Sequence, residues 1–118
     1  LSMEEGYRMT KELLRRAKPT ALFFGYHRHA QGGVRYLADA GYSIPDDISV
    51  IMVGTPVWAN LSSPQYHRVY QHEEWVGTTA GRILVAQIRG EASPLLREKR
   101  HVCPCTLLEG TSVKDLTK

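Results

Sequence analysis

The stretch Gly41-Tyr-Ser-Ile-Pro-Asp-Asp-Ile-Ser-Val-Ile-Met-Val-Gly54 decides the fold that this sequence predicts. It begins at a glycine suited to end a helix, turns at Pro45-Asp46-Asp47, and continues as a nearly continuous apolar run from Ile48 to Val53. Because polar and apolar residues do not alternate along this run, it predicts a strand covered on both faces, in a parallel sheet with helices on each side. Gly54-Thr55-Pro56 would follow the carboxyl end of that strand, where open α/β sheets bind ligands.

The residues before this run predict an alternation of helices and strands. Ser2 with Glu5 three residues later indicates a capping box, and the helix that starts there ends at Lys18-Pro19. A second apolar run over 20–25 predicts a buried strand, and a helical stripe from Ala30 to Gly41 separates the two runs. The order helix, strand, helix, strand predicts right-handed β-α-β connections and an α/β fold with a parallel sheet.

The second half of the chain has a looser pattern. We expect a loop over 56–64, an extended segment over 66–70, a polar loop over 91–100 and a last strand over 101–108. A helix over 73–90 carries Val76, Ala80, Leu84 and Ile88 at four-residue steps. Its two glycines, Gly77 and Gly81, predict that a neighbour packs closely against that face, because glycine in a helix costs about 1 kcal/mol relative to alanine. Residues 110–118 are expected to form a mobile tail.

Composition narrows the class of protein. A chain of 118 residues with 42% hydrophobic residues fits one domain with a core, and a net charge of +3, spread along the chain, does not indicate a nucleic-acid-binding surface. The Cys103-Pro-Cys105 pair matches no zinc or redox motif and predicts reduced thiols. No segment is long and apolar enough for a membrane and no signal peptide is present, which favours a cytoplasmic protein.

Nothing in the sequence indicates catalysis, a metal or a cofactor. The residues His27-Arg28-His29 have no acidic or cysteine partner nearby in the sequence, so we expect no metal site there. No nucleophile elbow, phosphate loop or dinucleotide fingerprint is found. We therefore expect no enzyme activity and no cofactor.

Several stretches resemble the LacI/GalR family of bacterial transcriptional regulators. Ile44-Pro-Asp-Asp-Ile-Ser-Val-Ile51 is similar to the family's "VPEDISVI". The same order and spacing of family motifs continue on both sides of it, over Ser2–Tyr7, Pro19–Phe23, Ala30–Gly32, Pro64–Gln71, Gly77–Gly90 and Leu107–Ser112. The resemblance covers nearly the whole chain. It implies that residues 1–118 form a Rossmann-like three-layer subdomain of a periplasmic-binding-protein-like fold, the C-terminal part of an effector-binding core.

The resemblance also implies partners. The family's DNA-binding domain and first effector subdomain have no counterpart in these residues, so we expect a fragment that contacts operator DNA only through an absent domain. Effector binding would change operator affinity by linkage. Homodimers are expected, with the first helix as a candidate contact. The helix over 73–89 belongs to the first subdomain in the family, so its apolar stripe is expected to pack back on this domain or onto a second copy.

The resemblance places the effector at the carboxyl ends of the strands. The family's Asn-Asp pair falls on Tyr26-His27, its later Asp pair on Gly54-Thr55, and its paired threonines on His67 and Arg68. The predicted ligand-binding residues are Tyr26, His27, Gly54, Thr55, Trp58, Arg68 and Gln71. Because most of these differ from the family pattern, three ligands stay open: a sugar-like effector, an aromatic-stacking or anionic one, or none.

Two other protein classes stay open on the sequence. A fragment of a periplasmic-type solute-binding protein predicts a signal peptide upstream, whereas a regulator predicts a helix-turn-helix there. A small flavodoxin-like α/β enzyme needs a nucleophile or an acid/base pair at the strand ends, and Gly54-Thr55 supplies neither.

Overall fold

A computed structural model describes residues 1–117, which divide into two compact units. Unit 1 comprises Leu1–Tyr70 and the described residues from Leu107 onward, and unit 2 comprises Gln71–Thr106. The elements, in chain order, are α1 (Met3–Arg16), β1 (Ala21–Phe24), α2 (His27–Asp39), β2 (Ser49–Val53), α3 (Val57–Asn60), β3 (His67–Tyr70), α4 (Glu73–Arg89), α5 (Pro94–Arg97) and β4 (Thr106–Leu108).

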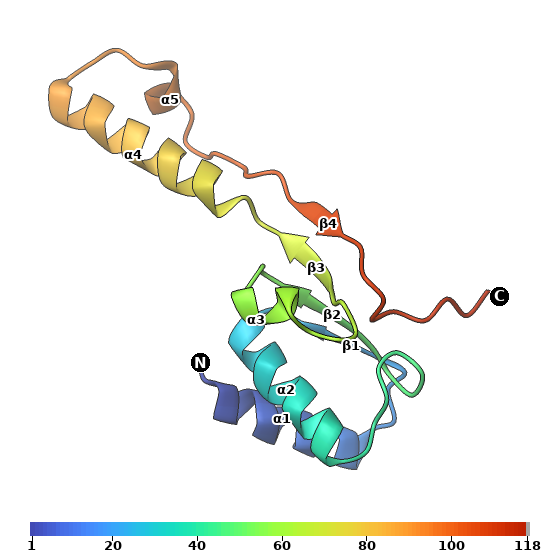
Figure 1. The fold of residues 1–118 in the computed structure, drawn as a ribbon. Coiled ribbons are helices and arrows are strands. Elements are labelled where there is room, and N and C mark those ends of the chain that lie inside the picture. The colour runs from blue at the N-terminus through green and yellow to red at the C-terminus, as the bar shows by residue number, and fades with distance from the viewer. Residues whose placement is uncertain (118) are drawn as a thin grey trace. The chain divides into compact units, whose positions relative to one another are not determined.

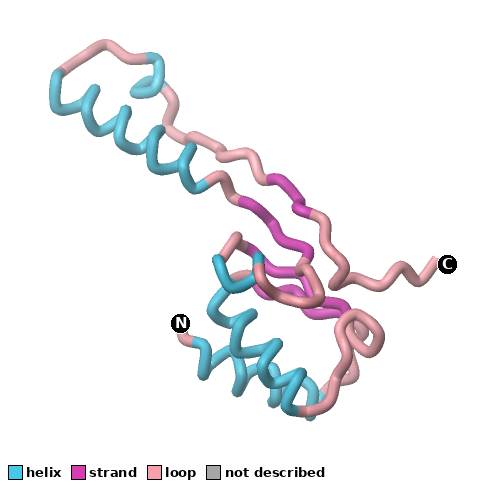
Figure 2. Tube along the Cα trace, viewed as in Figure 1, coloured by secondary structure: helices cyan, strands magenta, loops and turns pink. Residues whose placement is uncertain are grey.

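A mostly parallel sheet forms the centre of unit 1. Its strands follow the order β1-β2-β3-β4, and β1 pairs with β2, and β2 with β3, in parallel (Figure 1). Leu22 lies opposite Val50, and Met52 lies opposite Arg68. The parallel α/β fold predicted from the two apolar runs is therefore confirmed, with the strands side by side as Figure 2 shows.

The core lies between this sheet and helix α2. Leu22, Val50 and Met52 alternate along β1 and β2 on one face and are buried, and Ala30 and Leu37 from α2 are fully buried against them. The α2 helix extends beneath the strands in Figure 1, and α1 packs along it. Most of the apolar stripe of α2 therefore packs against one face of the sheet.

The opposite sheet face is less covered than the sequence predicts. Phe23 is 65% exposed, and Ile51 and Val53, which point to the same side, are half-buried. Among residues 1–117, helices α1 and α2 lie on the other face (Figure 1). The apolar runs predicted cover on both faces, but apolar character shows only that a side chain favours burial and does not identify the segment that buries it.

Helices α1 and α2 approach so closely that two positions require glycine. A Cβ added at Gly32 of α2 would lie 1.8 Å from the carbonyl oxygen of Met3, and one added at Gly6 of α1 would lie 2.3 Å from the carbonyl oxygen of His29. The predicted capping box holds the start of α1: Ser2 Oγ accepts from the Glu5 N–H at 3.1 Å, and Glu5 Oε2 accepts from the Ser2 N–H at 2.8 Å.

Ser112 fastens the end of the chain to the sheet. Its side chain is fully buried, donates to the Val50 carbonyl at 2.6 Å and accepts from the His67 N–H at 2.8 Å. The Val50 N–H donates to the Ser112 carbonyl at 2.9 Å. The mobility expected of residues 110–118 stays a prediction, and Lys118 lies outside the described residues. Ser112, near the start of this segment, is tied to two strands by these three hydrogen bonds.

Unit 2 contains α4 and the short α5. Helix α4 ends at Gly90, whose φ of 64° is the left-handed conformation favoured at a helix end, as the sequence predicts. The side chains of Val76, Leu84 and Ile88 are 47%, 57% and 76% exposed. The cover expected for this stripe, by this domain or by a second copy, stays a prediction. Among the described residues, no atom lies within 4 Å of a Cβ placed at Gly77 or Gly81, so the close neighbour expected there is not seen.

Two short helices lie within segments that the sequence predicts as loops. Helix α3 occupies part of the predicted loop over 56–64, and α5 lies within the predicted polar loop over 91–100. Each has four residues, which is too short for an apolar period to appear in the sequence. The last strand is also shorter than expected and begins at Thr106.

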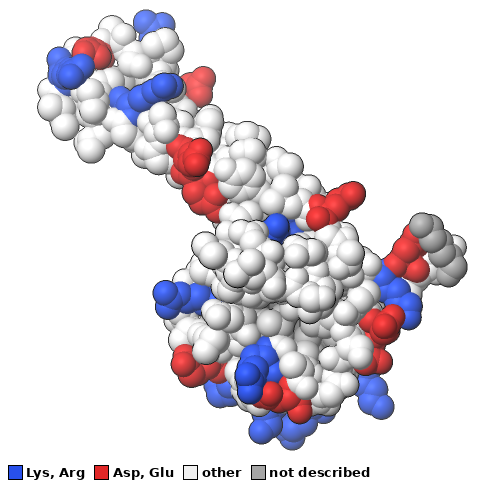
Figure 3. Space-filling view, in the orientation of Figure 1, with Lys and Arg blue, Asp and Glu red and all other residues white. Residues whose placement is uncertain are grey.

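The surface of unit 1 mixes charges of both signs. Over α1 and α2, Figure 3 shows basic and acidic side chains interspersed, and pairs such as Arg16–Glu12 and Arg35–Asp39 account for part of this pattern. Within residues 1–117, no helix combines the length and the apolar character needed to cross a bilayer.

The Ser112 contacts predict a large effect of removing one hydroxyl group. The Ser112→Ala substitution leaves the His67 N–H and the Val50 carbonyl without their side-chain partner in a buried place, and we expect a loss of about 2–4 kcal/mol in the free energy of unfolding. Urea titration followed by circular dichroism measures it. Thr117→Ala is the control, because that hydroxyl bonds to the exposed side chain of Asp115, and it should change the free energy by less than about 0.5 kcal/mol.

The close approach of α1 and α2 predicts that Gly32→Ala destabilises the fold by about 3 kcal/mol or more, since backbone atoms must move to admit the methyl group. Gly25→Ala is a matched control, because a Cβ there meets nothing within 4 Å and the glycine has no positive φ. Equal urea midpoints for the two variants would contradict the close packing of these two helices.

Candidate effector site

The carboxyl end of β1 leads into α2 through Tyr26 and His27. Tyr26 is the N-cap residue of α2, and its side chain makes no hydrogen bond to the first N–H groups of the helix. Its ring lies 4.9 Å from the His27 ring and 5.5 Å from the His29 ring, measured between centroids. An aromatic surface therefore stands at this strand end, where the family resemblance implies two polar residues.

The carboxyl end of β2 lies beside this aromatic group. Gly54 has a φ of 102°, in the region that favours glycine, and its N–H donates to the Val69 carbonyl at 2.9 Å. A Cβ at Gly54 would lie 3.4 Å from Cδ2 of His27. The structure thus brings together Tyr26-His27 and Gly54-Thr55, two pairs that are far apart in sequence, and Gly54 provides no carboxylate.

Helix α3 and strand β3 add a second aromatic group and a cation. The Trp58 ring contacts Tyr66 edge to face at 5.8 Å between centroids, and burial raises the pKa of the Tyr66 hydroxyl. Arg68 projects from β3 and its Nη1 donates to Oδ1 of Asn60 at 2.6 Å. Asn60 is absent from the residues predicted for the site. The only sequence signal for it is its place, two residues after Trp58 in the segment that follows β2.

Three polar atoms near these strand ends are buried and have no hydrogen-bond partner: His27 Nδ1, Trp58 Nε1 and Arg68 Nε. Among residues 1–117, Arg68 also has no carboxylate within ion-pair distance. A buried donor without an acceptor costs about 1–3 kcal/mol, so native proteins rarely keep one without a reason. These atoms are candidates for contact with a bound molecule.

Gln71 is the first residue of unit 2. Its backbone carbonyl accepts the S–H of Cys103 at 3.0 Å. Its predicted role as a ligand-binding residue, like that of the other six, stays a prediction. Among the described residues, no three His, Cys, Asp or Glu side chains are grouped to hold a metal ion.

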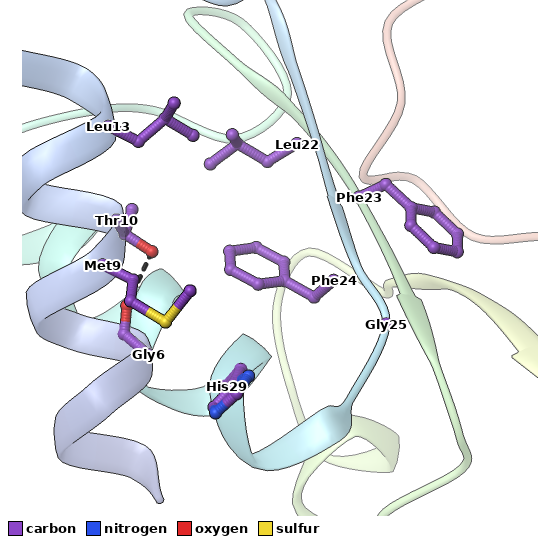
Figure 4. Close-up of a pocket in the computed structure, with 9 residues that line it drawn as sticks. All are labelled: Gly6, Met9, Thr10, Leu13, Leu22, Phe23, Phe24, Gly25 and His29. Atoms are coloured by element: carbon purple, nitrogen blue, oxygen red, sulfur yellow. Dashed lines mark hydrogen bonds between the residues drawn. The ribbon is translucent and has the colours of Figure 1, made fainter. Parts of the chain in front are cut away.

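A separate apolar cavity of about 340 Å³ lies between α1 and β1. Figure 4 shows Leu22 and Phe24 pointing toward α1, whereas Phe23 points to the other side of the strand. The hydroxyl of Thr10 already donates to the Gly6 carbonyl at 2.8 Å, so the cavity offers few free polar groups. None of the predicted site residues lines it; the lining residues are Gly6, Met9, Thr10, Leu13, Leu22, Phe23, Phe24, Gly25 and His29.

Comparison with known proteins agrees with the fold. Residues 2–113 match the family model described as a periplasmic binding protein-like domain. The repressor PurR of Pectobacterium carotovorum is 31% identical over 115 residues, which cover 95% of this chain and 32% of that protein. The chain therefore spans about a third of the length of the curated relatives it matches.

Two solved structures with bound sugars are similar. A LacI family transcriptional regulator from Enterococcus faecalis V583, with bound ribose, has a TM-score of 0.82 and 27% identity over 96% of this chain and 41% of that one. The complex of the transcriptional regulator CelR with cellobiose has a TM-score of 0.85 and 26% identity over 95% of this chain and 34% of that one.

Proposed function

Since the chain belongs to the periplasmic binding protein-like domain family, we propose that it is the effector-binding part of a LacI-type transcriptional regulator. The observation that carries this proposal is the group of buried, unpartnered polar atoms of His27, Trp58 and Arg68 near the carboxyl ends of parallel strands. Ligands of open α/β sheets bind at such ends. The neighbours that hold ribose and cellobiose support a small sugar-like effector.

The proposed role is a sensor without catalysis. Tyr26, His27, Gly54, Thr55, Trp58, Arg68 and Gln71 would contact the effector, and operator DNA would be contacted by a domain outside these residues. The effector would shift the regulator between two arrangements and so change its affinity for the operator; such coupling is typically about 5- to 150-fold. An enzyme is disfavoured, because the relatives are repressors and regulators and the strand ends carry no nucleophile with an adjacent base.

The regulator would act in the cytoplasm as a homodimer. Met9 and Leu13 on α1 are apolar and exposed, which supports the α1 helix as a contact between copies. The exposed stripe of α4 is the other candidate contact, through exchange of this helix between copies.

The coupling can be measured on the longer protein that contains this chain. Fluorescence anisotropy with operator DNA, with and without ribose or cellobiose, should show a change in affinity of at least about fivefold for a ligand that binds. The Trp58→Ala variant should keep the DNA affinity and lose the response. A signal peptide encoded upstream, in place of a helix-turn-helix, would instead favour a periplasmic solute-binding protein.

The dimer contact is tested by light scattering on the chain itself. We expect twice the monomer mass at tens of micromolar, and a monomer for Met9→Glu, because a charge in an apolar contact is costly to desolvate. The matched variant Ile88→Glu in α4 should stay dimeric. If Ile88→Glu gives the monomer and Met9→Glu does not, the contact is formed by α4, and a monomeric unsubstituted chain would contradict both.

A further inference from the structure

We infer that the effector carries an anionic group, a carboxylate or a phosphate, and that Arg68 binds it. This inference rests on the proposed function and specifies the chemistry of the same site. The sequence left open a sugar-like effector, an aromatic-stacking or anionic one, or none, and the contacts of Arg68 favour an anionic one. The class of ligand is therefore an acidic sugar derivative.

The site has unused donors and no carboxylate to match them. Arg68 Nε and Trp58 Nε1 carry hydrogens and are buried without an acceptor. The three positions where the family resemblance implies carboxylates hold His27, Gly54 and Thr55 instead. Each hydroxyl of a neutral sugar both donates and accepts, so it needs acceptors from the protein as well. A carboxylate or phosphate only accepts, and so it matches a site that supplies donors.

Asn60 positions Arg68 and leaves its charge free. The amide oxygen of Asn60 accepts from Nη1 at 2.6 Å, which fixes the guanidinium plane against the end of α3. Asn60 is neutral, and among residues 1–117 no carboxylate neutralises Arg68. The guanidinium therefore keeps N–H groups that Asn60 does not use, and these can donate charge-assisted hydrogen bonds to an anion.

The aromatic groups supply the sugar-binding part. Tyr26 and Trp58 are amphipathic rings, and each lies in the segment that follows a strand: Tyr26 after β1 and Trp58 after β2. A ring of carbon and oxygen atoms packs on such faces, and the acidic substituent would reach Arg68. A bare inorganic anion would leave the aromatic rings without a contact, so we expect it to bind less tightly than an acidic sugar.

The experiment is a titration of the ¹⁵N-labelled chain followed by NMR, in which arginine Nε–H and tryptophan Nε1–H give their own signals. The probes are glucose, glucuronate, glucose 6-phosphate and inorganic phosphate. We expect glucuronate or glucose 6-phosphate to shift the Arg68 Nε–H and Trp58 Nε1–H signals and to bind at least about tenfold more tightly than glucose or inorganic phosphate. Which of the two binds more tightly identifies the anion as carboxylate or phosphate.

The decisive variant is Asn60→Asp, which keeps the size and the contact of the side chain and adds a carboxylate to neutralise Arg68. We expect it to weaken the binding of the acidic sugar at least about tenfold. Arg68→Gln should do the same, and Arg35→Gln, which removes a surface cation paired with Asp39, should not.

The outcomes separate this inference from the proposed function. If glucose binds as tightly as its acidic derivatives and Asn60→Asp has no effect, the anion inference is wrong and the sensor proposal stands. If no probe shifts either signal, the anion inference is wrong, and the operator-binding experiment with ribose or cellobiose tests the sensor proposal separately. If inorganic phosphate binds as tightly as glucose 6-phosphate, the sugar part of the inference is overturned.

Discussion

The parallel register of the sheet is the constraint on which the site depends. Pairing of Leu22 with Val50 buries one side of both strands and brings Tyr26-His27 beside Gly54, because parallel strands end at the same edge. A slip of one residue would turn Leu22, Val50 and Met52 toward the exposed face, so the core and the site share one register. The buried Ser112 side chain holds this arrangement from the C-terminal segment by joining β2 to β3.

Sequence reasoning recovers the parts of the molecule that have a local signal. The strands β1 and β2, the capping box and the end of α4 at Gly90 follow from apolar runs and from residues suited to helix ends. The meeting of Tyr26-His27 with Gly54-Thr55 follows once the strands are taken as parallel. The Arg68–Asn60 bond does not follow, because it depends on α3, a helix too short to show periodicity and placed by its contacts with Tyr66.

The glycines show most clearly that a local sequence pattern does not determine which surfaces are closely packed. Gly77 and Gly81 lie four apart on one helix, which predicts close packing, yet both have open space among the described residues. Gly6 and Gly32 lie on different helices, share no sequence pattern, and meet opposing backbone atoms at distances that exclude any side chain. The spacing of glycines reports which face of a helix they share. Only the position of the second helix decides whether that face is crowded.

The same distinction applies to function. The fold is kept by the apolar positions of β1, β2 and α2, which match the family over most of the chain. The strand ends of this chain carry a glycine, two aromatic rings and an arginine that donates to a neutral amide. A site with surplus donors discriminates by charge, because a neutral ligand leaves the guanidinium uncompensated. The matched family therefore accounts for the fold, whereas the chemistry of a ligand has to be argued from the polar groups at this chain's own strand ends.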